Sequence, residues 1–165
     1  MDKSRVGEGG LALASTKSTQ ISLAGVRIGR YSLNERRQRL LRRVPLSGDF
    51  VKLEAGTLEL MDLAYLSAKT GDEFAILRSK QEDVLFHGTA MNCRFMDELE
   101  EGLMTHRYEL IGHSHPGEIE PEPSLEDRSF LRKIGQRRSA VISGMTGRIS
   151  NYTDDFCDQG GWGLC

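Results

Sequence analysis

The stretch from 108 to 127, YELIGHSHPGEIEPEPSLED, constrains the fold more than any other part of the chain. Its apolar start predicts a β-strand over 108–115, and Pro116 ends that strand. Three prolines stiffen the loop that follows. Ser124 precedes Asp127 by three positions, the spacing of a helical capping box with Asp in place of the usual Glu. The stretch therefore predicts a strand, a loop and a helix in close succession.

The same alternation extends over residues 49–153, which we expect to form one domain. Strand and helix patterns interleave there, which predicts an α/β fold with a mixed, curved β-sheet flanked by helices. The expected elements are a strand in 49–56, a helix in 57–70, a hairpin in 73–90, a helix in 96–107, the strand 108–115, a helix in 124–136 and a pair of strands in 139–152.

Outside this domain the sequence is less regular. Residues 1–20 are predicted to be a flexible tail and residues 154–165 a loose C-terminal tail. An N-terminal extension over 21–48 is expected to hold a short strand and then a basic helix over 32–43. The arginines of that helix form either a solvated face or a surface for an acidic partner, and the sequence leaves both open.

The composition excludes several classes of function. The 165 residues are 38% hydrophobic and 28% charged, which suits a soluble globular protein. A formal net charge of −2 makes nucleic acid an improbable partner, and no apolar run reaches the roughly 20 residues that a membrane helix needs. The first residues lack a secretory signal pattern, and the three cysteines are isolated. A cytoplasmic location is therefore expected.

Two histidines end the strand 108–115. Residues two apart on a strand point to the same side, so His113 and His115 are expected to present their imidazoles together. Asp127, in the first turn of the next helix, can face back towards them. Two imidazole nitrogens and one carboxylate oxygen would form a zinc site with one open position. The alternative is an ordinary strand followed by a capped helix, and the two interpretations are compatible.

The order His113-Ser-His115-Pro, a loop, and Ser124-x-x-Asp127 resembles the JAMM motif of the MPN/JAB domain metalloproteases. The loop ending Pro-Glu-Pro-Ser-Leu-Glu-Asp is similar to that of the RadC-like bacterial branch. The resemblance implies a three-layer, cytidine-deaminase-like fold, with His113, His115 and Asp127 as zinc ligands and Ser124 as a donor to the oxyanion. The loop between His115 and Ser124 has eight residues, one more than is usual in the pattern.

The resemblance also implies a glutamate far upstream as general base. Glu73, at the start of a predicted strand, matches best, ahead of Glu54 and Glu109. The implied activity is zinc-dependent hydrolysis of a peptide or isopeptide bond, after the C-terminus of a ubiquitin-like or sulfur-carrier protein. The alternatives are a metal-free MPN-type scaffold and a RadC-like protein that works near DNA. The remaining His87 and His106 are expected to be structural, and Cys93 to be a small buried residue.

Overall fold

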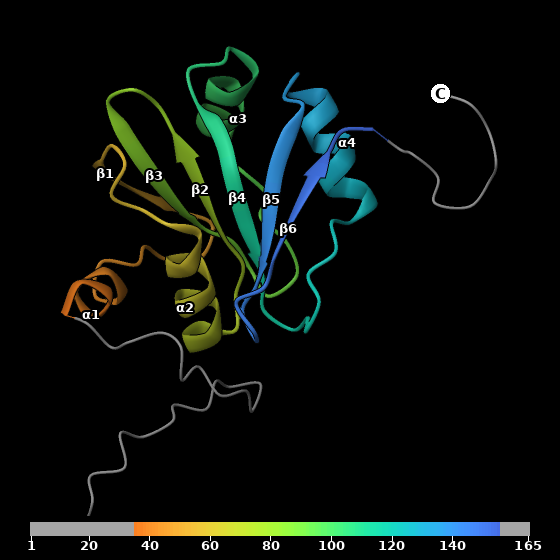
Figure 1. The fold of residues 1–165 in the computed structure, drawn as a ribbon. Helices are drawn as coiled ribbons and strands as arrows, with labels where there is room; N and C mark the ends of the chain where they lie inside the picture. Colours follow the sequence, from red (N-terminus) through yellow and green to blue (C-terminus); the bar gives the residue numbers. More distant parts are fainter. Residues whose placement is uncertain (1–34, 156–165) are drawn as a thin grey trace, which may run out of the picture.

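The computed structural model describes residues 35–155, which form four helices and six strands (Figure 1). No helix in this range is long and apolar enough to cross a bilayer. The helices are α1 (Glu35–Leu41), α2 (Leu60–Thr70), α3 (Asp97–Met104) and α4 (Leu125–Lys133). The strands are β1 (Phe50–Glu54), β2 (Phe74–Arg78), β3 (Glu82–His87), β4 (Glu109–His115), β5 (Arg138–Ser143) and β6 (Ile149–Thr153).

Every helix and strand expected between residues 49 and 153 is present, and the α/β prediction is confirmed. The boundaries differ by one to three residues at most ends. The basic helix is also present and ends at Leu41, two residues before the expected end. The short strand predicted before the basic helix, within 19–31, and most of the two predicted tails lie outside the described residues.

The six strands form one open mixed sheet in the order β1-β3-β2-β4-β5-β6. Only the β4–β5 pair is parallel, and every other pair is antiparallel. A parallel pair needs a crossover connection, and the loop after β4 together with α4 provides it. The β2–β4 register shifts between Ile76 and Leu77, which bends the centre of the sheet.

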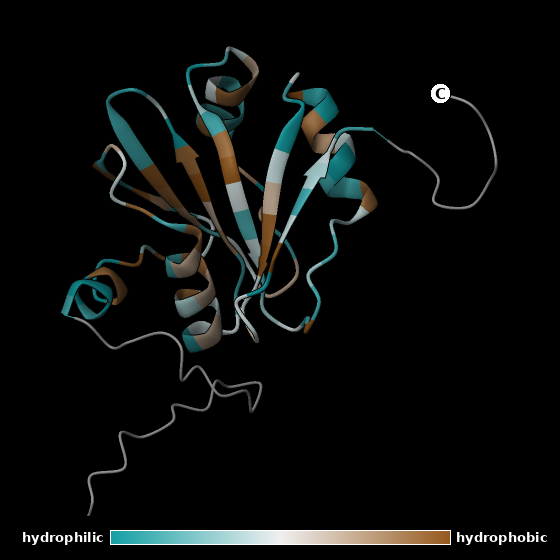
Figure 2. Cartoon of the chain, viewed as in Figure 1, coloured by the Kyte–Doolittle hydropathy of each residue, from teal (hydrophilic) through white to brown (hydrophobic). Residues whose placement is uncertain are grey.

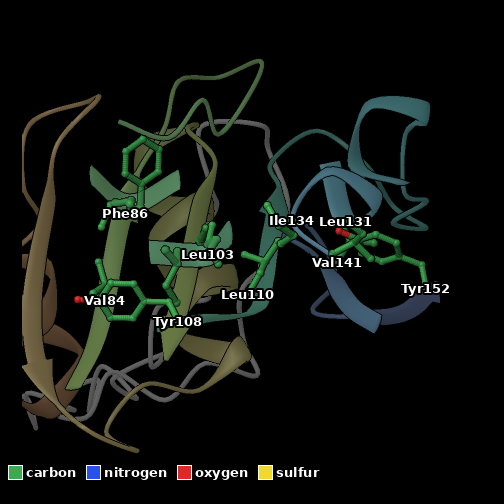
Figure 3. Packing of buried hydrophobic residues seen from close by; sticks show 12 residues of the cluster. Val84, Phe86, Leu103, Tyr108, Leu110, Leu131, Ile134, Val141 and Tyr152 are labelled. Atoms are coloured by element: carbon green, nitrogen blue, oxygen red, sulfur yellow. The ribbon is translucent and has the colours of Figure 1, made fainter. Parts of the chain in front are cut away.

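Helices cover both faces of the sheet, which gives three layers (Figure 1). Successive residues of β2 alternate between two cores, as expected for a strand buried on both sides. Phe74 and Ile76 pack with α2, whereas Ala75 and Leu77 pack on the face that carries α3 and α4. Figure 3 shows this second core, which runs from Phe86 across to Tyr152. The sheet is therefore buried on both faces around its central strands.

The basic helix α1 docks on α2 through a buried carboxylate. Asp62 is fully buried, and its two oxygens each lie 2.7 Å from a guanidinium nitrogen of Arg36. Arg37 adds a contact of 3.3 Å. Burial would raise the pKa of Asp62, but the hydrogen bonds from Arg36 and from the backbone of Glu59 outweigh it and hold the pKa below its ordinary value. The N-terminal extension is thus part of the folded unit from residue 35 onward.

We expect Arg36→Ala to lower the free energy of unfolding by about 1–2 kcal/mol, because it leaves a buried charge with fewer donors. The expected loss is smaller than for a fully buried ion pair, because the Arg36 side chain is 42% exposed and Arg37 still contacts Asp62 in the variant. A depressed pKa in the folded state stabilises the protein above the unfolded pKa of about 4. The difference between wild type and variant should therefore shrink as the pH falls below about 4, as measured by urea unfolding.

Arg39→Ala is the matched control, because Arg39 is 72% exposed and contacts only Glu35 at 3.8 Å among the ion pairs of the described residues. It should change the stability by less than about 0.5 kcal/mol. Equal losses for the two variants would show that the ion pair does not hold α1 to α2.

Candidate metal centre

His113 and His115 lie at the C-terminal end of β4, where its hydrophobic residues give way to hydrophilic ones (Figure 2). His113 is paired with Ala75 on β2 and with Val141 on β5, so its side chain shares the face that carries α3 and α4. Both histidines are buried. Ser114 points to the opposite face, where its hydroxyl accepts a hydrogen bond of 2.9 Å from the Phe74 amide. The strand therefore presents both imidazoles together, as predicted.

Asp127 reaches the histidines from the first turn of α4. Ser124 is the N-cap, and its hydroxyl accepts from the Asp127 amide at 3.1 Å. In return Asp127 Oδ2 accepts from the amide and the hydroxyl of Ser124, at 2.7 and 2.8 Å. These reciprocal bonds form a capping box. They fix one carboxylate oxygen and leave the other, Oδ1, facing His113.

The three side chains converge on one point. His113 Nε2 lies 3.1 Å from His115 Nε2 and 3.2 Å from Asp127 Oδ1. His115 Nε2 lies 3.6 Å from Asp127 Oδ2. Ligands at about 2.0–2.1 Å from a tetrahedral metal ion are separated by roughly 3.3 Å. The two spacings from His113 Nε2 match this value, and one ligand atom from each of the three residues lies within 4.8 Å of the others, so the group could hold one ion. No other group of three His, Cys, Asp or Glu residues converges in this way within residues 35–155.

Hydrogen bonds between the side chains of the site shift the pKa values of His115 and Asp127 in opposite directions. Burial lowers the pKa of His115, but hydrogen bonds to Asp127 and Glu118 outweigh burial and raise it to about 9. Burial alone would raise the pKa of Asp127, yet the hydrogen bonds from His113 and His115 hold it well below its usual range. A metal ion at this point would take the place of the proton that these groups share.

Glu73 lies beside the three converging side chains. It directly precedes β2, and its backbone is fixed by two hydrogen bonds of 2.8 Å, to the Thr89 carbonyl and from the Gly88 amide. Its side chain is buried, and burial raises its pKa, which the charges of His115 and His113 partly oppose. Glu54 and Glu109, the other two candidates for a general base, are exposed and do not line the cleft at the metal centre.

A cleft of about 800 Å³ opens onto the site. Its lining includes residues 90–95 of the β3–α3 loop, residues 116–118 and the start of α4. Glu73, His113, His115, Ser124 and Asp127 all line this cleft. The five residues that the sequence singled out are therefore brought together, although they come from three separate segments.

Two further residues of the cleft were missed or misread in the sequence. Cys93 is only partly buried and lines the cleft together with Glu73. Burial and the charge of Glu73 raise the pKa of this thiol. Glu118 contacts His115 at 2.8 Å. Cys93 has no local spacing that indicates its role, because its position depends on how the β3–α3 loop returns to the site. Glu118 lies only three residues after His115, but the sequence does not show that the loop turns its carboxylate onto the imidazole.

Comparison with known proteins gives no further assignment: no protein-family model, no curated protein and no solved structure matches the chain. The geometry of the cleft and the resemblance of the motif are therefore the grounds for assigning a function.

We expect the protein to bind one divalent transition-metal ion per chain. His113→Ala, His115→Ala and Asp127→Ala should each abolish tight binding, because a site with three protein ligands has no spare donor. Titration of the metal-free protein with Zn²⁺ as the probe ion, with circular dichroism to monitor folding, measures this.

His106→Asn is the control, since His106 is exposed at the end of α3, outside the cleft. Asn also tolerates the positive φ of 56° at that position. The metal-site assignment fails if folded variants of all three ligands bind Zn²⁺ as tightly as His106→Asn does.

Proposed function

We propose that the protein is a zinc-dependent peptidase or isopeptidase of the JAMM type. The observation that carries the proposal is Glu73, a buried carboxylate in the same cleft as His113, His115 and Asp127 but outside the converging set. Two histidines and a carboxylate also bind iron in other proteins. An additional buried carboxylate poised to move a proton is the feature that favours hydrolysis.

The residues divide the chemistry between them. When bound, zinc would supply a water of lowered pKa and a Lewis acid for the scissile carbonyl. Glu73 would accept a proton from the attacking water and later deliver it to the leaving amine. Burial shifts the pKa of Glu73 upwards, towards neutral pH, which suits a group that must both accept and donate a proton.

Ser124 is proposed to donate a hydrogen bond to the developing oxyanion. In the structure its hydroxyl proton is directed to Asp127 Oδ2. The hydroxyl would have to turn into the cleft, which it also lines, to reach the substrate. Asp127 would keep the hydrogen bond from the Ser124 amide during that rotation, so the carboxylate would stay in place.

The proposed substrate is the C-terminal segment of a ubiquitin-like or sulfur-carrier protein, in the cytoplasm. The motif resemblance supports this class. The cleft of about 800 Å³ beside the converging side chains is compatible with this class, because it leaves room for a substrate segment next to them. A metal-free scaffold is disfavoured, since the ligand set is complete and its spacing fits one ion. A RadC-like role near DNA has no support from the net charge of −2.

We expect Glu73→Gln to keep the zinc content and the fold while hydrolysis falls by at least about 10²-fold. An amide of nearly the same shape cannot accept the proton, and general acid–base catalysis contributes on the order of 10²–10⁴. Zinc content, unfolding and cleavage of linear fusions and isopeptide conjugates of ubiquitin-like proteins are measured together.

Glu54→Gln and Glu109→Gln are the matched controls, because both carboxylates are exposed and lie outside the cleft. They should keep wild-type activity. The peptidase proposal is contradicted if zinc-loaded wild type cleaves no member of the substrate panel. The assignment of the base is contradicted if Glu73→Gln stays active while one control does not.

Ser124→Ala should lower kcat by on the order of 10²–10³, the effect of removing one oxyanion donor. The same change removes the N-cap of α4 and should cost about 1 kcal/mol of stability. Rates are therefore measured at a temperature where unfolding curves show both proteins fully folded. A kcat equal to that of wild type under those conditions would leave Ser124 with the role of a helix cap alone.

A further inference from the structure

Glu118 holds the second nitrogen of His115. Its Oε2 lies 2.8 Å from His115 Nδ1, on the opposite side of the ring from Nε2, which faces His113 and Asp127. The same oxygen accepts a hydrogen bond of 3.2 Å from the Glu122 amide. Glu118 therefore contacts a proposed metal ligand without belonging to the converging set.

This contact selects one form of the ring. A histidine that offers Nε2 to a metal ion must carry its proton on Nδ1. An ionised carboxylate is a hydrogen-bond acceptor only, so Glu118 favours the tautomer that carries the proton on Nδ1 and leaves Nε2 free to bind a metal ion. The same hydrogen bond fixes the plane of the ring. Within the described residues, no side chain hydrogen-bonds Nδ1 of His113, whose ring instead lies edge-on to Tyr152 at 6.0 Å between centroids. The two histidines are thus held by different means.

The backbone around Glu118 is fixed independently of its side chain. Three consecutive residues of the loop are bound by the β5–β6 turn: Ser143 Oγ donates to the Glu118 carbonyl, Thr146 Oγ1 donates to the Ile119 carbonyl at 2.8 Å, and Arg148 pairs with Glu120. Loss of the Glu118 carboxylate would therefore leave the loop in place.

We propose that Glu118 is a positioning residue that orients His115 and thereby sets the metal affinity of the site. The inference rests on the metal centre of the proposed function. Carboxylates that hold a metal-binding histidine contribute about 10- to 100-fold to metal affinity in other proteins. The Glu118 side chain is 46% exposed, so water weakens the contact and the lower end of this range applies.

The test measures metal affinity rather than peptidase activity. Zn²⁺ affinity is determined by competition with a chelator of known affinity, for wild type and for Glu118→Ala, Glu118→Gln and Glu122→Ala. We expect Glu118→Ala to bind Zn²⁺ about tenfold more weakly. Glu118→Gln should recover most of the loss, because its amide oxygen still accepts from Nδ1–H.

Glu122→Ala is the control for charge. Glu122 is an exposed residue of the same loop, and only its backbone amide takes part in the contact. It should keep wild-type affinity. In the Co²⁺-substituted protein, the visible absorption bands should change in Glu118→Ala and not in Glu122→Ala, because they report the orientation of the ligands.

The outcomes separate this inference from the proposed function. Weak Zn²⁺ binding by wild type that the ligand variants leave unchanged would contradict the metal centre, and with it both the proposed function and the role of Glu118. Tight binding that depends on His113, His115 and Asp127, but that Glu118→Ala and Glu122→Ala reduce equally, would overturn the positioning role and leave the centre intact. Unchanged affinity and spectrum in Glu118→Ala, together with lost hydrolysis, would also overturn it, since Glu118 would then act in the chemistry.

Discussion

The reciprocal hydrogen bonds between Ser124 and Asp127 fix two things at once. They determine where α4 begins, and they aim one carboxylate oxygen of Asp127 at His113. A carboxylate on a flexible loop would lose side-chain entropy on joining a buried cluster. Here that entropy is already lost when the helix forms, because the amide and the hydroxyl of Ser124 hold the other oxygen. The start of the helix and the geometry of the metal centre are therefore one structural feature.

The sheet supplies the other half of the geometry. The parallel pairing of β4 with β5 requires a crossover, and the crossover carries α4 back over the end of β4. β2 is the neighbour of β4 on the edge away from β5, and the Ser114 hydroxyl accepts a hydrogen bond from the amide of Phe74, the first residue of β2. This bond holds Glu73, which directly precedes Phe74, next to β4. Ser114 thus has a structural role between the two histidines that are proposed as metal ligands. A change in the β2–β4 register would move Glu73 relative to His113 and His115.

Local patterns predicted much of this arrangement. The two-residue spacing of His113 and His115 and the three-residue spacing of Ser124 and Asp127 follow from strand and helix geometry, which is fixed by neighbouring residues. The position of Cys93 in the cleft and the contact of Arg36 with Asp62 could not be predicted in this way. Each depends on which loop or helix returns to a site, and that is decided by packing over the whole domain. The basic helix illustrates this, since two of its arginines bind a buried carboxylate of α2.

A capped helix beside an ordinary strand accounts for Ser124 and Asp127 but not for the rest of the cluster. Burying two imidazoles and two carboxylates opposes folding unless their charges are matched. An apolar core at the end of β4 would avoid that cost. Burial raises the pKa of Glu73, and the nearby negative charge of Asp127 adds a smaller increase. A divalent cation at the convergence point of His113, His115 and Asp127 would offset the negative charge of both carboxylates, which is consistent with the proposed metal centre.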